Sequence, residues 1–156
     1  FSIIGNGGLL WAFIGGLLLL DASTARYSAY LVVSLSLCAL VNNVFFKPLC
    51  DRERPCDTYQ NIPLLIKRPM GSSFPSGHAA TSFASATALF FMDPRIGMIA
   101  LFVAFIIAFS RLYLFVHYPT DILFGMVSGV ALSLLGIQIV NLFFHFVPIA
   151  YFALPA

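Results

Sequence analysis

Residues 122–146 read ILFGMVSGVALSLLGIQIVNLFFHF, a run without Asp, Glu, Lys or Arg that is long enough to cross a lipid bilayer as one helix. Four further apolar runs precede it, at residues 3–20, 27–46, 76–92 and 96–115. Each of them is long enough, or nearly long enough, to span the hydrocarbon. The sequence therefore predicts an all-α fold, a polytopic transmembrane bundle of about five helices, or up to six if a segment precedes the first residue.

The composition agrees with a lipid environment. Of the 156 residues, 60% are hydrophobic and 9% are charged, and the mean hydropathy is +0.96. Soluble domains average about a quarter charged residues, so a water-soluble globule is excluded. We expect residues 1–156 to form a single transmembrane domain. The net charge of +2 is too weak and too scattered for a nucleic-acid partner, and nothing indicates the oligomeric state.

The longest break between apolar runs, residues 47–75, carries eight charged residues and five prolines and is expected to lie outside the hydrocarbon. Helices that cross completely alternate in direction. The ends of the second and fourth runs and the beginnings of the third and fifth therefore share one membrane surface, which we call the motif face. The basic and histidine residues that gather there are Lys47, Arg52, Arg54, Lys67, Arg68, Arg111, His78 and His117.

The first cluster on the motif face is KPLCDRERP, residues 47–55. Lys47 as a point charge and Arg54 as a planar fork can both donate to one tetrahedral anion. The alternative is that basic residues beside a helix end only reach toward the membrane surface.

The second cluster is FPSGH, residues 74–78, directly ahead of a helix rich in small residues. The free N–H groups at a helix start, the Ser76 hydroxyl and the close approach allowed by Gly77 predict an anion cradle. His78 in the first turn can give a proton to a departing oxygen. The alternative is that Ser76 is only an N-cap and His78 only an interfacial polar residue.

The third cluster is SRLYLFVHYPTD, residues 110–121. A charge such as Arg111 within an apolar helix needs a partner or a role. Pro119 suits the first turn of the last helix, which places Asp121 within reach of His117. The carboxylate is expected to fix the imidazole tautomer and leave the other ring nitrogen free to attack, although such a pair can also simply tie a loop to a helix.

A metal site competes for His78, His117 and Asp121. These three residues are interleaved with the cations of the same clusters, which repel a divalent ion but suit a phosphate dianion. We therefore expect no metal and no cofactor, and the pattern favours phosphoryl transfer.

Small residues predict close helix packing. Ala and Ser dominate the run 76–92, and Gly125 and Gly129 are expected to lie against it. Cys50 and Cys56 flank a polar stretch and are either a disulfide or two unpaired thiols, whereas Cys38 is expected to be a packing residue.

The three clusters in order, Lys-x6-Arg-Pro, Pro-Ser-Gly-His and Ser-Arg-x5-His-x3-Asp, resemble the type 2 phosphatidic acid phosphatase family, integral membrane lipid phosphatases related to vanadium-dependent haloperoxidases. The resemblance extends over essentially the whole chain. It implies that His117 is a nucleophile forming a phosphohistidine, that Asp121 orients it, and that His78 protonates the leaving oxygen.

The resemblance also implies which residues hold the phosphate oxygens: Lys47, Arg54, Ser76, Gly77 and Arg111. The substrate is then a lipid phosphate or diphosphate, such as undecaprenyl diphosphate, phosphatidylglycerol phosphate or phosphatidic acid. The site is expected on the extracytoplasmic face of a bacterial cytoplasmic membrane. Three further cations, Arg52, Lys67 and Arg68, either contact a second phosphate or lipid headgroups or are solvated loop charges.

Two other functions use the same residues. A lipid phosphotransferase passes the phosphoryl group to an acceptor other than water. A non-catalytic membrane protein binds anions in a cationic vestibule, but a conduction path needs polar residues at mid-membrane depth, and few are present in these runs.

Overall fold

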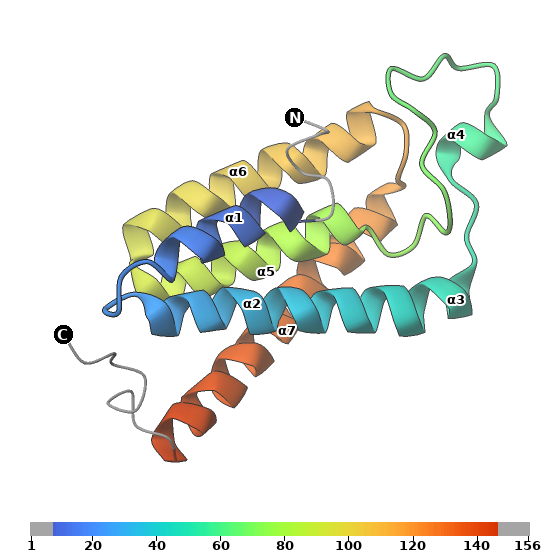
Figure 1. The fold of residues 1–156 in the computed structure, drawn as a ribbon. Helices are drawn as coiled ribbons and strands as arrows, with labels where there is room; N and C mark the ends of the chain where they lie inside the picture. Colours follow the sequence, from blue (N-terminus) through green and yellow to red (C-terminus); the bar gives the residue numbers. More distant parts are fainter. Residues whose placement is uncertain (1–7, 147–156) are drawn as a thin grey trace.

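The structure is a computed structural model and describes residues 8–146. Within that range the chain forms helices and connections without a strand (Figure 1), which confirms the all-α fold. The helical elements in chain order are α1 (Leu9–Leu18), α2 (Ala25–Leu40), the π-helix η2 (Val41–Phe46), α3 (Lys47–Cys50), α4 (Pro55–Thr58), α5 (Gly77–Met92), α6 (Pro94–Tyr113) and α7 (Pro119–Phe146).

Among residues 8–146, three helical segments are long and apolar enough to cross a membrane: the one that begins with α2 at Ala25, then α6 and α7. The helix α5 has 16 residues and α1 has 10, so both are shorter than a full span. The expected first run, residues 3–20, begins among residues outside the described part. The five apolar runs thus correspond to α1, α2 with η2, α5, α6 and α7.

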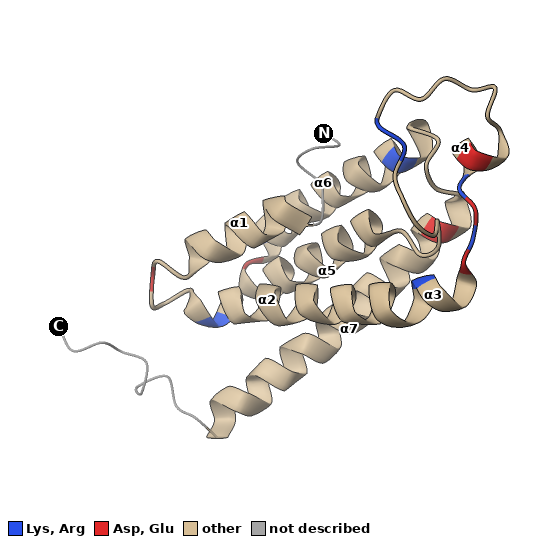
Figure 2. Cartoon of the chain, turned by 45° about the vertical axis from the view of Figure 1, so that its right-hand side comes forward, with Lys and Arg blue, Asp and Glu red and all other residues tan. Residues whose placement is uncertain are grey.

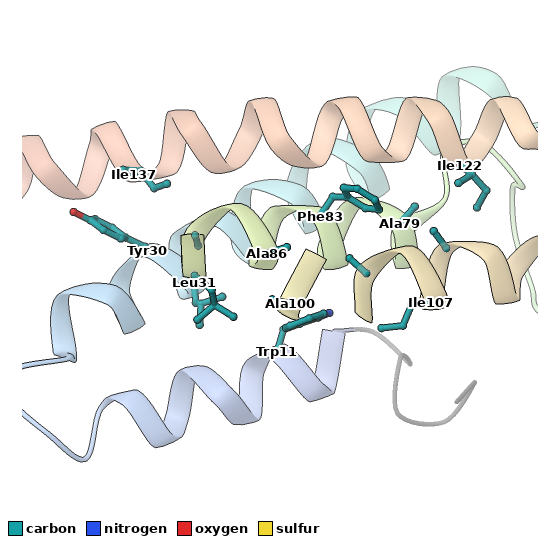
Figure 3. Packing of buried hydrophobic residues seen from close by; sticks show 14 of the residues in the cluster. Trp11, Tyr30, Leu31, Ala79, Phe83, Ala86, Ala100, Ile107, Ile122 and Ile137 are labelled. Atoms are coloured by element: carbon teal, nitrogen blue, oxygen red, sulfur yellow. The ribbon is translucent and has the colours of Figure 1, made fainter. Parts of the chain in front are cut away.

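The helix α5 lies at the centre and packs against α2, α6 and α7 (Figure 1). Its alanines make this possible, because small side chains let neighbouring backbones approach closely in a membrane. Ala79, Ala80 and Ala84 are completely buried. From α1, the buried Trp11 donates its indole N–H to Ser82 Oγ at 3.1 Å. Figure 3 shows these helices closing around one continuous apolar core.

The predicted contact of Gly125 and Gly129 with α5 is confirmed. A Cβ atom at Gly125 would lie 2.7 Å from the Ser76 carbonyl oxygen, and one at Gly129 would lie 2.3 Å from the Ala80 carbonyl oxygen. Only hydrogen fits at either position, so α7 and the start of α5 are held at a fixed separation.

Gly129→Ala is therefore expected to lower the thermal midpoint in detergent, with a destabilisation of about 1–3 kcal/mol, because the added methyl group meets backbone that cannot move aside. The matched control is Gly16→Ala in α1, where an added Cβ has nothing within 4 Å. That change is expected to be neutral or slightly stabilising. Equal midpoints for the two variants would contradict the packing described here.

The helix that begins with α2 runs further than the sequence predicts. It continues through η2 and α3 to Cys50, so the break begins at Asp51 rather than at Lys47. At the junction of η2 and α3, the Lys47 N–H donates a π-helical hydrogen bond to the carbonyl oxygen of Asn42, five residues back. This places Lys47 on the helix itself and not in the loop.

Most of the charged residues gather at one end of the bundle, where α3 and α4 lie, and a few lie at the opposite end (Figure 2). This is the motif face, and the connections α1–α2 and α5–α6 lie at the other end (Figure 1). Of the cysteines, Cys50 is exposed, Cys38 and Cys56 are buried, and all three are unpaired.

Candidate active site

A cavity of about 230 Å³ lies where the three sequence clusters meet. Its wall includes Lys47, Arg54, Gly77, His78, Arg111 and His117. These residues come from α3, the following loop, the start of α5, the end of α6 and the connection to α7. The predicted convergence of both imidazoles and three cations at one membrane face is therefore present in the fold.

His117 lies in the connection between α6 and α7 and is 6% exposed. Its Nδ1 is 2.8 Å from the backbone carbonyl oxygen of Ser73. A carbonyl oxygen only accepts, so Nδ1 carries the proton and Nε2 presents its lone pair. Nε2 faces the Arg54 guanidinium at 3.4 Å, on the side of the cavity.

The environment of His117 keeps the ring neutral. Burial lowers its pKa below the usual value, and the nearby Arg54 and Arg111 lower it further, whereas the negative charge of Asp121 partly opposes this shift. A neutral imidazole is the form that can attack phosphorus.

The lowered pKa predicts a measurable titration. The neutral form should persist as the pH falls through 6.5, the ordinary value for histidine, and protonation should occur only below it. NMR of histidine-labelled protein in detergent measures this, with the signal assigned by its disappearance in His117→Ala. A midpoint at or above 6.5 would contradict the burial of this ring.

Asp121 in the first turn of α7 is completely buried and fully hydrogen-bonded. Its Oδ1 accepts from Arg52 Nη1 at 2.7 Å. Its Oδ2 accepts from the Ser73 hydroxyl and, at 2.9 Å, from the Tyr118 backbone N–H. The same oxygen is 3.6 Å from His117 Nδ1, which is a charge contact rather than a close hydrogen bond.

The tautomer of His117 is the expected one, with Nε2 free, but Asp121 is not the group that fixes it. The Ser73 carbonyl makes the close contact with Nδ1, and Asp121 supplies a negative charge behind the ring. Ser73 binds both partners, since its hydroxyl holds the carboxylate while its carbonyl holds the imidazole.

The structure does not support the interpretation of Arg52 as a solvated loop charge, because its guanidinium is engaged by other side chains. Besides Asp121, its Nη1 donates to Thr120 Oγ1 at 2.7 Å, and its guanidinium carbon lies 4.1 Å from the centre of the Tyr118 ring. Arg68 pairs with Asp57 at 3.1 Å. Neither arginine belongs to the cavity wall, so neither is placed to contact a second phosphate there.

Arg54 is 5% exposed and holds the site together through backbone carbonyl groups. Nε donates to Gly71 and Nη1 to Val116, both at 3.0 Å, and Nη2 donates to Ser72 at 3.2 Å. The side chain thus fixes the loop ahead of α5 against the segment that carries His117. It also places positive charge in the cavity wall.

In the second cluster, residues 74–78, one polar residue has a structural role and two other residues line the cavity. Ser76 is completely buried, caps α5 by accepting from the Ala79 N–H at 3.4 Å, and lies outside the cavity wall. Gly77 and His78 line the cavity. An added Cβ at Gly77 would have nothing within 4 Å, so the space beside it is open to a ligand.

Lys47 and Arg111 complete the cationic wall. Arg111 in the last turn of α6 is 3% exposed, and Lys47 at the start of α3 is half-buried. Within residues 8–146, no three His, Cys, Asp or Glu side chains are grouped so that they could hold a metal ion.

Two contributors escape sequence reasoning. Ser73 acts partly through its backbone carbonyl, for which no residue spacing gives a signal. Asn42 lines the cavity from η2. The sequence signal for Asn42 is a polar residue within an apolar run, which does not say what the side chain faces.

The comparisons with known proteins agree with this geometry. The model of the PAP2 superfamily matches residues 27–144. The chain belongs to the PAP2 superfamily. That range contains all three clusters and every catalytic or phosphate-binding residue that the sequence predicts.

Relatives in the PAP2 superfamily carry names of lipid phosphatases. The chain is 29% identical over 131 residues to an undecaprenyl-diphosphatase of Sulfolobus acidocaldarius, covering 83% of this chain and 63% of that protein. It is 40% identical over 82 residues to a decaprenylphosphoryl-5-phosphoribose phosphatase of Mycolicibacterium smegmatis, covering 53% of this chain and 43% of that one. The chain spans less than two thirds of the length of these relatives.

A solved PAP2 structure has the same fold. Aquifex aeolicus LpxE superposes with a TM-score of 0.68 at 24% identity, covering 88% of this chain and 87% of that one. A phosphatidylglycerolphosphate phosphatase from Bacillus subtilis gives a TM-score of 0.61 at 21% identity, covering 90% of this chain and 78% of that one. The chain is thus an integral membrane protein with the PAP2 helical fold.

Proposed function

We propose that this protein is a lipid phosphate phosphatase that works through a phosphohistidine at His117 and needs no metal ion. The observation that carries the proposal is the cavity at the motif face, whose wall combines two imidazoles with Lys47, Arg54 and Arg111. The names of the relatives support a lipid phosphate as the substrate.

In the first step, His117 Nε2 attacks the phosphorus atom and the bond to the leaving oxygen breaks. His78, whose Nε2 has no hydrogen-bond partner in the described structure, enters this step as the imidazolium, gives a proton to that oxygen and becomes neutral. Water then attacks the phosphohistidine, gives a proton back to His78 and releases inorganic phosphate.

The cations act on the charge that develops at the phosphoryl oxygens. Lys47 and Arg111 reach the cavity from two different helices, and Arg54 lies beside the attacking nitrogen. The open space at Gly77 lets an oxygen approach the first turn of α5, where the backbone N–H groups point outward. Ser76 supports this turn as its N-cap.

The test is phosphate release from a panel of lipid phosphates in detergent, with chelator present throughout. The panel contains a polyprenyl diphosphate, phosphatidylglycerol phosphate and phosphatidic acid. We expect turnover of at least one of them without added metal, and protein quenched in alkaline detergent, where a phosphohistidine survives, should carry phosphate on His117. A requirement for a divalent cation, or binding without phosphate release, would refute the proposal.

We also propose that the cavity opens on the extracytoplasmic side of a bacterial cytoplasmic membrane, as the family resemblance implies. Cys50 provides the test, because it is the exposed cysteine and lies on α3 beside the cavity. A membrane-impermeant maleimide added to intact spheroplasts should label it. Labelling only after lysis would reverse the orientation, and Cys50→Ser is the control for specificity.

A further inference from the structure

Asn42 is a buried polar residue to which the proposed chemistry gives no task. Its side chain lines the same cavity as the catalytic groups, and the residue is 2% exposed. Both side-chain atoms, Oδ1 and Nδ2, are buried without a hydrogen-bond partner in the described structure. Buried polar groups in proteins are nearly always paired, so a carboxamide left open on both atoms requires a reason.

The π-helix η2 brings Lys47 onto the side of the helix that already carries Cys38, Ala39 and Asn42. In an α-helix, residues five apart differ by about 140° around the axis and face different neighbours. The wider π turn, closed by the hydrogen bond between the Lys47 N–H and the Asn42 carbonyl, aligns the two residues. Asn42 and Lys47 therefore line one cavity from successive turns.

Asn42 also lies on the membrane side of the cations. The helix runs toward the motif face, so Cys38, Ala39 and Asn42 come before Lys47 and line a deeper part of the cavity. Across from them, Thr81 of α5 is already engaged, since its hydroxyl donates to the Gly77 carbonyl at 2.9 Å. The tail of a bound lipid must extend from the cavity into the membrane through this deeper part. The part of the substrate beside Asn42 is therefore the part attached to the leaving oxygen.

The cavity has space for such a group. Its volume of about 230 Å³ corresponds to roughly seven water molecules at about 30 Å³ each, more than one phosphate group fills. The cations of the cavity wall contact the phosphoryl group that is transferred, whereas the Asn42 carboxamide in the deeper part is neutral. Its N–H is a buried donor that this part of the wall offers to an oxygen atom, and the neighbouring Asn43, which also lines the cavity, is exposed.

We propose that Asn42 is a specificity-determining residue whose Nδ2 donates a hydrogen bond to an oxygen on the leaving-group side of the scissile P–O bond. The inference rests on the proposed phosphatase activity. The preferred substrates then carry a further acceptor oxygen close beyond the leaving oxygen, either on a second phosphate or on an ester or hydroxyl group. Prenyl and alkyl monophosphates carry only carbon beyond the leaving oxygen itself and leave the carboxamide unpaired.

The experiment compares two matched pairs of substrates: farnesyl diphosphate with farnesyl phosphate, and dioctanoyl phosphatidic acid with dodecyl phosphate. Intrinsic leaving-group reactivity differs within each pair, so the quantity compared is the change in kcat/KM that Asn42→Leu causes for each substrate. We expect a loss of roughly ten-fold to hundred-fold for an oxygen-bearing substrate and a change of no more than about three-fold for both monophosphates. The pair that responds identifies the source of the oxygen.

Stability separates this role from a structural one. Asn42 has no partner within the described protein, so Asn42→Leu should leave the thermal midpoint unchanged or raise it. Asn42→Asp keeps the size but replaces the donor by an acceptor, and it should lose the same selectivity. Ser85→Ala is the matched control, since the Ser85 hydroxyl is also buried and unpartnered but lies outside the cavity wall.

Equal losses for all four substrates, no loss for any of them, full activity of Asn42→Asp, or the same shift in Ser85→Ala would each overturn the proposal. Failure of the unaltered protein to hydrolyse any of the four would instead refute the phosphatase activity on which it rests. The two failures are therefore distinguishable.

Discussion

His117→Ala is expected to abolish phosphate release from lipid phosphates, with kcat reduced on the order of a thousand-fold or more. The variant has no nitrogen at the position of Nε2, so the covalent intermediate cannot form and water would have to attack phosphorus directly. The cationic wall from Lys47, Arg54 and Arg111 remains in place. Substrate should therefore still bind, and the loss should fall on kcat rather than on binding.

The measurement is phosphate release together with binding of the same lipid phosphate to protein in detergent micelles. His145→Ala serves as the control, because this exposed imidazole lies at the other end of α7. It should retain full activity. If His117→Ala still turned over substrate at the original rate, the nucleophile assignment would be wrong, and if it lost binding as well, the ring would have a structural role.

Asp121→Asn is expected to reduce kcat on the order of a hundred-fold while KM stays nearly constant. The reason is charge, not ring orientation, because the Ser73 carbonyl holds His117 Nδ1 at 2.8 Å in either case. Attack by Nε2 leaves positive charge on the imidazole, and the carboxylate at 3.6 Å stabilises that charge. A neutral amide does not.

The amide also turns a donor toward one of the groups that now donate to the carboxylate, so the thermal midpoint must be measured beside the activity. Asp93→Asn is the matched control, since Asp93 caps α6 at the opposite end of the bundle and has no contact with the site. A KM that rises as much as kcat falls would show that Asp121 mainly shapes the pocket.

The outline of the bundle could be predicted from the sequence because burial in lipid leaves a one-dimensional signal. Runs of apolar residues mark the helices, and alternation of direction assigns their ends to one face or the other. This was sufficient to bring His78, Arg111 and His117 to the same membrane surface. The glycines of α7 were also predictable, since a small residue every four positions marks a close helix contact.

The exact ends of the helices could not be predicted as well from the sequence. The segment that begins with α2 continues four residues beyond its expected end at Phe46, because α3 follows η2 without a break and ends at Cys50. Hydropathy reports where a helix leaves the hydrocarbon, whereas backbone hydrogen bonding decides where it ends.

The sequence by itself thus determined the membrane-embedded helical fold and the set of residues that meet at one face, because these follow from composition and from the order of polar and apolar residues along the chain. Only the tertiary structure decided the partners within that face: Arg52 on Asp121, Arg54 on backbone carbonyls, and Ser73 between the carboxylate and the imidazole. The contacts of Arg54 and His117 are made to backbone carbonyl groups, which every residue possesses, and the ion pair of Arg52 with Asp121 joins segments that are far apart in the sequence. No pattern of side chains specifies them until the helices have packed.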